Sequence, residues 1–235
     1  IDYDNESYFR SLPSYKNLVT EHYAEMGMPT VFDALKKSQS PYIQSTIARL
    51  LSETASFNND DLAGSFNQMI ALATVPSDKE AIEKQYNKIK GLAKGSPSPS
   101  FNYETVDGKS VSLEDLKGKN IYIDVWATWC GPCIAEVPAL KKLEAKYHND
   151  NIAFVSISVD EPKNKEKWKS MIKDKGLKGI QLITGNGWGT PFIGKYLITG
   201  IPRFILLDTD GNIVSADAPR PSSGQVLEEM IDGLL

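Results

Sequence analysis

An apolar run that leads into a Cys-x-x-Cys motif restricts the fold of this chain more than any other feature. Residues 121–126 are apolar except for Asp124, and a run of this length predicts a buried strand. Cys130 and Cys133 follow after a short loop, and residues 134–147 have the pattern of a helix. The motif is therefore expected in a turn between a strand and a helix, with Cys130 at the N-terminus of the helix.

The N-terminus of a helix is a favourable position for a nucleophilic thiol. Unpaired N–H groups and the helix dipole stabilise a thiolate at Cys130, and the thiolate is the form that attacks a disulfide. Cys133 lies one turn later and can resolve the mixed disulfide. Gly131 and Pro132 stand between them, and proline suits a first helical turn. We expect Cys130 to be the more exposed and more acidic thiol, in a redox-active pair that needs no other cofactor.

Other interpretations of the two cysteines fit less well. A structural zinc site needs about four ligands, but the chain has two cysteines and two histidines, His22 and His148, without a paired spacing. No metal is therefore expected. A peroxidase of the peroxiredoxin type would have Pro-x-x-x-Thr-x-x-Cys, but Ile123 stands seven residues before Cys130. An inert structural disulfide is the remaining alternative.

The composition excludes several classes of protein. The chain of 235 residues has a net charge of −4 and no basic block, which argues against a nucleic-acid partner. No apolar run approaches the ~18 residues that a transmembrane helix needs. The chain begins with Ile1 and has no signal segment, which is typical of a trimmed or mature form.

The clearest break in the pattern is the segment 95–100, with two prolines and three serines. It predicts a linker between a domain of residues 1–95 and one of residues 96–235. The first domain has no catalytic signature. It has helical periodicity over four stretches: 15–23, 41–51, 62–73 and 78–89. A helical bundle that packs against or binds something is the simplest interpretation.

The second domain alternates strands with helices, which predicts an α/β sheet with helices on both faces. A hairpin is expected around Asp107-Gly108. Further strands are expected at residues 121–126, 152–159, 180–184, 203–207 and 212–215, and helices at 134–147, 163–175 and 226–235.

The segment from Asp124 to Cys133 resembles the active-site segment of the thioredoxin superfamily almost position for position. The resemblance covers roughly residues 96–235 and implies a thioredoxin-like fold, a mixed central sheet flanked by helices, after the all-α domain. It implies that Asp124 is a buried acid behind the dithiol that accepts a proton for Cys133. It also implies that Pro202 is cis and that Ile201 presents its backbone to a substrate.

The residues that lead into this segment are similar to those of TlpA/ResA-type proteins. Ser98-Pro99-Ser100-Phe101 and Leu113 to Lys119 carry this likeness. The resemblance implies an exported bacterial oxidoreductase with an AhpC/TSA-like domain, located in the periplasm or cell envelope, and it allows a lipid or membrane anchor upstream. It also places Glu161 where a glutamate influences the cysteines.

Two positions depart from the ResA pattern. Gly131-Pro132 replaces Glu-Pro between the cysteines, and Arg203 replaces the threonine after the cis proline. We expect Trp129, Gly131, Pro132, Ile201 and Arg203 to contact the substrate.

The expected function is disulfide exchange with protein substrates in the reducing direction. An upstream thiol donor is expected to supply the electrons. The alternative is a binding module, in which the helical domain recognises a partner and the thioredoxin-like domain is mainly a scaffold.

Overall fold

The computed structural model describes residues 32–33, 36, 41–57 and 59–235. It divides into two compact units, Ile1–Gly91 and Leu92–Leu235. The helix expected over residues 15–23 lies outside the described residues.

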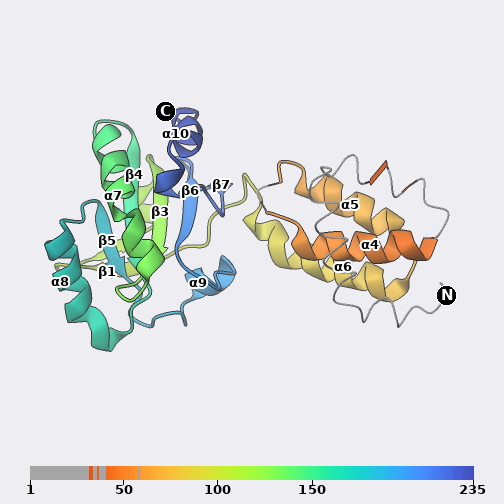
Figure 1. The fold of residues 1–235 in the computed structure, drawn as a ribbon, viewed down its shortest axis with the longest axis horizontal. Coiled ribbons are helices and arrows are strands. Elements are labelled where there is room, and N and C mark those ends of the chain that lie inside the picture. The colour runs from red at the N-terminus through yellow and green to blue at the C-terminus, as the bar shows by residue number, and fades with distance from the viewer. Residues whose placement is uncertain (1–31, 34–35, 37–40, 58) are drawn as a thin grey trace. The chain divides into compact units, whose positions relative to one another are not determined.

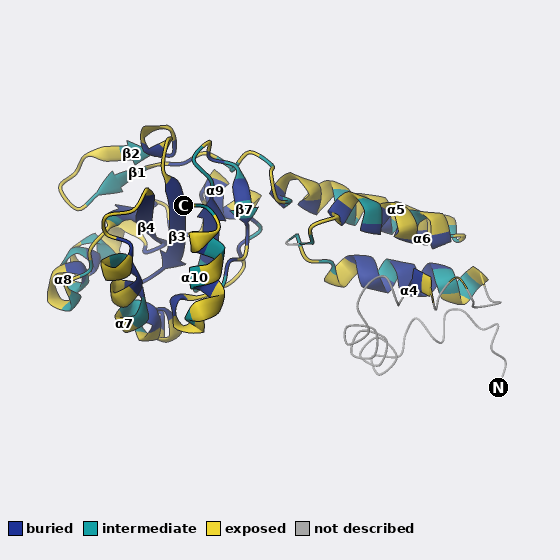
Figure 2. Cartoon of the chain, turned by 90° about the horizontal axis from the view of Figure 1, so that it is seen from above, coloured by how far each residue is buried: buried dark blue, intermediate teal, exposed yellow. Residues whose placement is uncertain are grey.

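The first unit is helical, as expected. Its described helices are α4 (Pro41–Thr54), α5 (Leu62–Leu72) and α6 (Pro76–Ile89). Proline occupies the first turn of α6, where its missing N–H costs nothing, and Asp61 caps α5 by accepting from the N–H of Gly64 at 2.8 Å. The apolar stripes of the three helices are buried (Figure 2), among them Ile47, Leu51, Phe66, Met69 and Ile82.

The segment expected to be a linker is part of the second unit. Gly95 N–H donates to the carbonyl of Ile213 at 2.7 Å, and Ser98 N–H donates to the carbonyl of Gly211 at 3.0 Å. Leu92 is also buried. Two backbone N–H groups of this segment are thus satisfied by carbonyls of the second unit. The division between the units falls after Gly91, four residues before the expected boundary.

The second unit is built on one seven-stranded sheet of order β2-β1-β5-β4-β3-β6-β7. The strands are β1 (Asn102–Thr105), β2 (Ser110–Ser112), β3 (Asn120–Trp126), β4 (Ile152–Ser158), β5 (Ile180–Ile183), β6 (Arg203–Leu207) and β7 (Ile213–Ser215). Strands β3, β4 and β5 are parallel, and the other pairings are antiparallel. The expected mixed sheet is confirmed.

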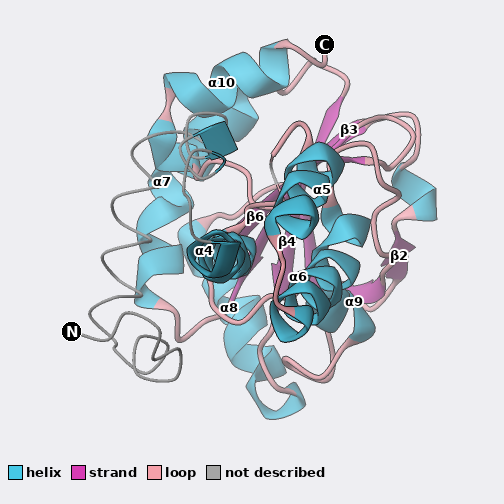
Figure 3. Ribbon diagram, turned by 90° about the vertical axis from the view of Figure 1, so that its right-hand side faces the viewer, coloured by secondary structure: helices cyan, strands magenta, loops and turns pink. Residues whose placement is uncertain are grey.

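Helices cover both faces of this sheet. Helices α7 (Gly131–Lys146) and α8 (Lys165–Lys175) connect parallel neighbours in the same direction, so right-handed crossovers place both on one face. The ammonium of Lys141 on α7 donates to the carbonyl of Lys175 at 3.0 Å. Helix α10 (Gln225–Asp232) shares this face, and the short α9 (Pro191–Lys195), which the sequence pattern did not predict, lies on the other (Figures 2 and 3).

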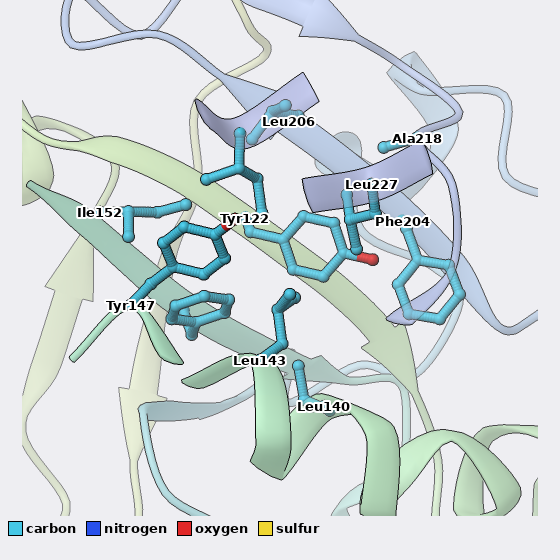
Figure 4. Packing of buried hydrophobic residues seen from close by; sticks show 11 residues of the cluster. Tyr122, Leu140, Leu143, Tyr147, Ile152, Phe204, Leu206, Ala218 and Leu227 are labelled. Atoms are coloured by element: carbon cyan, nitrogen blue, oxygen red, sulfur yellow. The ribbon is translucent and has the colours of Figure 1, made fainter. Parts of the chain in front are cut away.

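The core between α7, α10 and the sheet surrounds Tyr122 (Figure 4). Its ring stacks on Phe204 with centroids 5.8 Å apart, and its hydroxyl donates to the carbonyl of Pro219 at 2.8 Å. Leu140 and Leu143 of α7 point from the helix toward this ring. The packing fixes the axis of α7 over β3, and so fixes the turn that joins them.

Candidate active site

The turn between β3 and α7 holds the two cysteines. Cys130 N–H donates to the carbonyl of Ala127 at 3.1 Å, and Cys130 is the N-cap residue of α7. The two cysteines form a disulfide with their Cα atoms 5.3 Å apart. The Sγ of Cys130 accepts from the N–H of Cys133 at 3.2 Å. A helix N–H therefore points at the sulfur expected to carry negative charge after reduction.

The two cysteines do not differ in exposure. Cys130 is 5% exposed and Cys133 is 6% exposed in the disulfide form. That Cys130 is the more exposed thiol of the reduced pair stays a prediction. The asymmetry of the pair lies instead in the hydrogen bond to Cys130 and in the groups that surround Cys133.

Behind Cys133 is a small cavity of about 20 Å³ that Asp124, Glu136, Pro202 and Phe204 also line. A cavity of this size has room for about one water molecule. Asp124, Glu136 and Cys133 therefore line the same small cavity.

Asp124 is the buried acid of this cavity. Burial raises its pKa to about 7, although the Ser156 hydroxyl, which donates to its Oδ1 at 2.6 Å, opposes the shift, and the charge of Glu144 adds to it. A carboxyl group with a pKa near neutrality can both accept and return a proton at physiological pH.

The Ile201–Pro202 peptide bond is cis, as the resemblance implied. Strand β6 begins at the next residue and pairs antiparallel with β3, with Arg203 opposite Val125. This pairing carries Pro202 to the end of β3, where it lines the cavity together with Cys133. Ile201 and Pro202 are both partly exposed, so a substrate can reach this backbone.

Glu136 is a site residue that the sequence analysis missed. It is 8% exposed and lines the cavity. Its carboxylate accepts from the N–H of Ser222 at 2.9 Å and from the Ser222 hydroxyl at 2.8 Å, and Arg220 lies 3.6 Å away. The available signal was its place on α7, three residues after Cys133 and therefore on the same side of the helix.

Glu161, which the resemblance placed near the cysteines, is not among the residues that line the cavity. Its side chain is 61% exposed and forms an ion pair with Lys163 at 2.6 Å. The residue before it, Asp160, is instead fully buried. The β4 strand ends at Ser158, so the chain leaves the sheet here and turns Glu161 toward solvent.

The residues expected to contact substrate fall into two groups. Trp129 is 53% exposed, and Gly131 and Pro132 are exposed beside it. Arg203 is different, because Asp124 lies opposite Phe204 in the sheet, and Arg203 therefore lies on the other face. Its guanidinium pairs with Asp217 at 3.2 Å and donates to the carbonyl of Ala216 at 3.4 Å, so its charge is directed away from Asp124.

Neither a metal site nor a membrane-spanning helix is found among the described residues. No group of three or more histidine, cysteine, aspartate or glutamate side chains is placed to hold a metal ion there. No helix within the same residues is long and apolar enough to cross a membrane.

Comparison with known proteins places this site in a family. Residues 93–230 match the Redoxin family. The chain belongs to the Redoxin family. Within it, the chain is a TlpA/ResA-like member of the thioredoxin superfamily and a thioredoxin-like thiol–disulfide oxidoreductase.

Several known proteins are similar to this chain. The thiol-disulfide oxidoreductase ResA of Bacillus cereus is 31% identical over 141 residues, which are 60% of this chain and 76% of that protein. A Bacteroides vulgatus protein assigned as a thiol-disulfide oxidoreductase is 56% identical, with a TM-score of 0.52 over 61% of this chain and 92% of its own. The thioredoxin domain of a second oxidoreductase from that species is 30% identical. The match has a TM-score of 0.54 and covers 60% of this chain and 97% of that domain.

Proposed function

We propose that this protein reduces disulfides in protein substrates through Cys130 and Cys133. One observation carries the proposal: the disulfide lies at the N-terminus of α7, with Cys130 accepting a helix N–H and Cys133 beside a cavity lined by Asp124. An inert structural disulfide has no need for an acid whose pKa burial raises to about 7 next to one of its sulfurs.

The first step is attack by Cys130 in the reduced protein. Its thiolate forms a bond to one sulfur of the substrate disulfide, and the substrate S–S bond breaks. The leaving substrate thiolate takes a proton. The cis peptide before Pro202 leaves the backbone of Ile201 available to pair with an extended substrate segment. Trp129 forms an exposed apolar rim for the same segment.

The second step releases the substrate. Asp124, in its ionised form, accepts the proton of the Cys133 thiol through the small cavity. The Cys133 thiolate attacks the Sγ of Cys130, so the Cys130–Cys133 disulfide forms and the mixed disulfide breaks. The second substrate sulfur leaves and is protonated. Two electrons and two protons have then passed to the substrate, and the protein is in the oxidised form seen here.

An upstream thiol donor then returns the protein to the dithiol form, so no cofactor besides the cysteines is needed. The Gly131-Pro132 pair is that of thioredoxin, whose potential is about −270 mV. The pairing of Arg203 with Asp217 supports the same direction, because this cation is neutralised. The resemblance to exported TlpA/ResA-type proteins supports a place in the bacterial periplasm or cell envelope, with protein thiols as partners.

Reduction of insulin disulfides by the full chain, with dithiothreitol as the donor, tests the proposal. Wild type should accelerate the reaction, and Cys130→Ser should reduce the rate to that of dithiothreitol alone. After reduction and removal of dithiothreitol, Cys133→Ser should still attack insulin and accumulate a mixed disulfide that is visible as a mass adduct on Cys130. A Cys130→Ser variant with wild-type activity would overturn the proposal.

A further inference from the structure

Asp160 is a buried carboxylate that the proposed reaction does not use. It is 0% exposed, and a buried carboxylate is costly unless it is hydrogen-bonded. Three donors meet it. Thr128 donates its backbone N–H to Oδ2 at 2.8 Å and its hydroxyl to Oδ1 at 2.8 Å, and the Ser158 hydroxyl donates to Oδ2 at 2.7 Å.

The register of the sheet explains why these groups meet. Strands β3 and β4 are parallel, and Trp126 lies opposite Ser158. Thr128 and Asp160 are each two residues further along, so they remain opposite one another after the strands have ended. The Val159 N–H also donates to the carbonyl of Trp126 at 2.9 Å. Hydrogen bonds therefore join the two loops that follow β3 and β4, at the C-terminal ends of these strands, where the dithiol lies.

The loop that Asp160 holds leads directly to the nucleophile. Thr128 is two residues before Cys130, and Cys130 N–H donates back to the carbonyl of Ala127. The Cys130 Sγ accepts from the N–H of Cys133 at 3.2 Å, a close contact for a sulfur acceptor. A small shift of the loop would lengthen this contact and weaken the stabilisation of the thiolate.

Asp160 is not placed to transfer a proton to Cys133. Asp124 and Glu136 line the cavity behind that sulfur, and Asp160 does not. Both of its oxygens accept from Thr128, and one also accepts from Ser158. Its contribution must therefore pass through the position of the loop.

We propose that Asp160 is a positioning residue, which fixes the Thr128–Cys130 turn through Thr128 and thereby maintains the reactivity of Cys130. This inference rests on the proposed function, since it concerns the same nucleophile. The positioning residue is thus the buried Asp160 and not its exposed neighbour Glu161, and Thr128 links Asp160 to the turn.

A double-mutant cycle on the full, reduced chain tests this. The readout is the pH profile of the alkylation rate of Cys130 by iodoacetamide, with the labelled residue mapped by mass spectrometry. Thr128→Val keeps the shape of the side chain but removes the hydroxyl donor. It should raise the apparent pKa of Cys130 by about half a unit, which slows alkylation at neutral pH by about threefold. Thr128→Ser restores the hydroxyl and should restore the rate.

Asp160→Asn gives the second half of the cycle. If Thr128 acts through Asp160, Thr128→Val should change the Cys130 rate much less in the Asp160→Asn background than in wild type. Equal effects in the two backgrounds would overturn the proposal. If Asp160→Asn does not fold, the comparison of Thr128→Val with Thr128→Ser decides, because those variants change only one buried hydroxyl or methyl group.

A matched variant separates positioning from general stability. Asp208 also accepts two backbone N–H groups in a turn, from Asp210 at 3.0 Å and from Asn212 at 2.7 Å. It follows β6, at the opposite end of the sheet from the dithiol. Asp208→Asn should lower the melting temperature and leave the Cys130 profile unchanged. If Thr128→Val lowers the melting temperature but leaves the profile unchanged, Asp160 is only structural and the inference fails.

The outcome is distinguishable from a failure of the proposed function. If wild type does not reduce insulin, the proposed function fails. If wild type is active and Thr128→Val reacts like wild type, only the role of Asp160 fails.

Discussion

At the scale of single residues, the proposed chemistry depends on three carboxyl groups that differ in their surroundings. Asp124 is buried with one hydroxyl donor, and its pKa is raised to about 7. Glu136 is held by Ser222 and lies near Arg220. Asp160 is held by Thr128 and Ser158. Asp124 is suited to move a proton, whereas Glu136 and Asp160 are suited to hold the loops near the dithiol.

Asp124 should make stability depend on pH. Its folded pKa of about 7 lies above the ordinary value of 3.8, so the folded state binds the proton more tightly. The contribution of Asp124 to stability should therefore be greatest below about pH 4, fall as the pH rises to about 7, and stay level above that. The loss is at most about 4 kcal/mol, from roughly three pKa units. Thermal unfolding of wild type and Asp124→Asn from pH 4 to 8 measures it.

Asp124→Asn should remove most of this slope and be the more stable protein at pH 8. Asp210→Asn, at an exposed turn position, should keep the wild-type slope. Equal slopes for wild type and Asp124→Asn would contradict a raised pKa at this carboxyl.

The same residue should control the second chemical step. Below about pH 7 Asp124 is protonated and cannot accept the proton of Cys133, so release of the substrate should slow as the pH falls. In Asp124→Asn, release should be slower by about 10²-fold or more at pH 7.5, the usual size of a general-base contribution. Stopped-flow decay of the mixed disulfide measures this step, and an unchanged decay would exclude Asp124 from it.

At the scale of elements, the sequence pattern predicts those strands and turns that are determined by residues close together in the chain. The turn at Cys130 and the strands β3 and β6 could be predicted because their periodicity and motifs are contained in short segments. Glu136 and Asp160 could not, because their burial depends on Ser222 and Thr128, which are distant in sequence. The segment 95–100 was predicted as a linker from its prolines and serines, but the carbonyls of Gly211 and Ile213 satisfy its backbone.

The connection from α8 to β5 gives an element-scale prediction. Gly179 has a φ of +66°, and a Cβ there would lie 2.7 Å from the carbonyl oxygen of Phe154. Gly118 has a φ of +89° with open space around it. Gly118→Ala should cost about 1 kcal/mol of unfolding free energy, from the backbone conformation alone. Gly179→Ala should cost at least about 2 kcal/mol, because the backbone must also move. Urea unfolding that gives equal costs would contradict this contact.

At the scale of the whole molecule, two compact units share one chain. The sheet closes without the helical unit, since all seven strands and the dithiol lie within Leu92–Leu235. The described helices of the first unit bury apolar stripes, and both cysteines belong to the second unit. We therefore expect the helical unit to select partners rather than to take part in the chemistry.

Truncation tests this division. Residues 92–235 alone should reduce insulin at a rate within about twofold of the full chain, an effect of less than about 0.5 kcal/mol on the barrier. The truncated protein should trap fewer native partners than the full chain when both carry Cys133→Ser. Identical sets of trapped partners would contradict a selecting role for the helical unit.

The central claim is that Cys130 is the nucleophile of a reducing dithiol. A short pulse of iodoacetamide on the reduced full chain at pH 7, followed by peptide mass mapping, tests it most directly. Cys130 should be labelled first and Cys133 slowly, because Cys130 caps the helix and accepts the N–H of Cys133. Faster labelling of Cys133 would show that Cys130 is not the nucleophile.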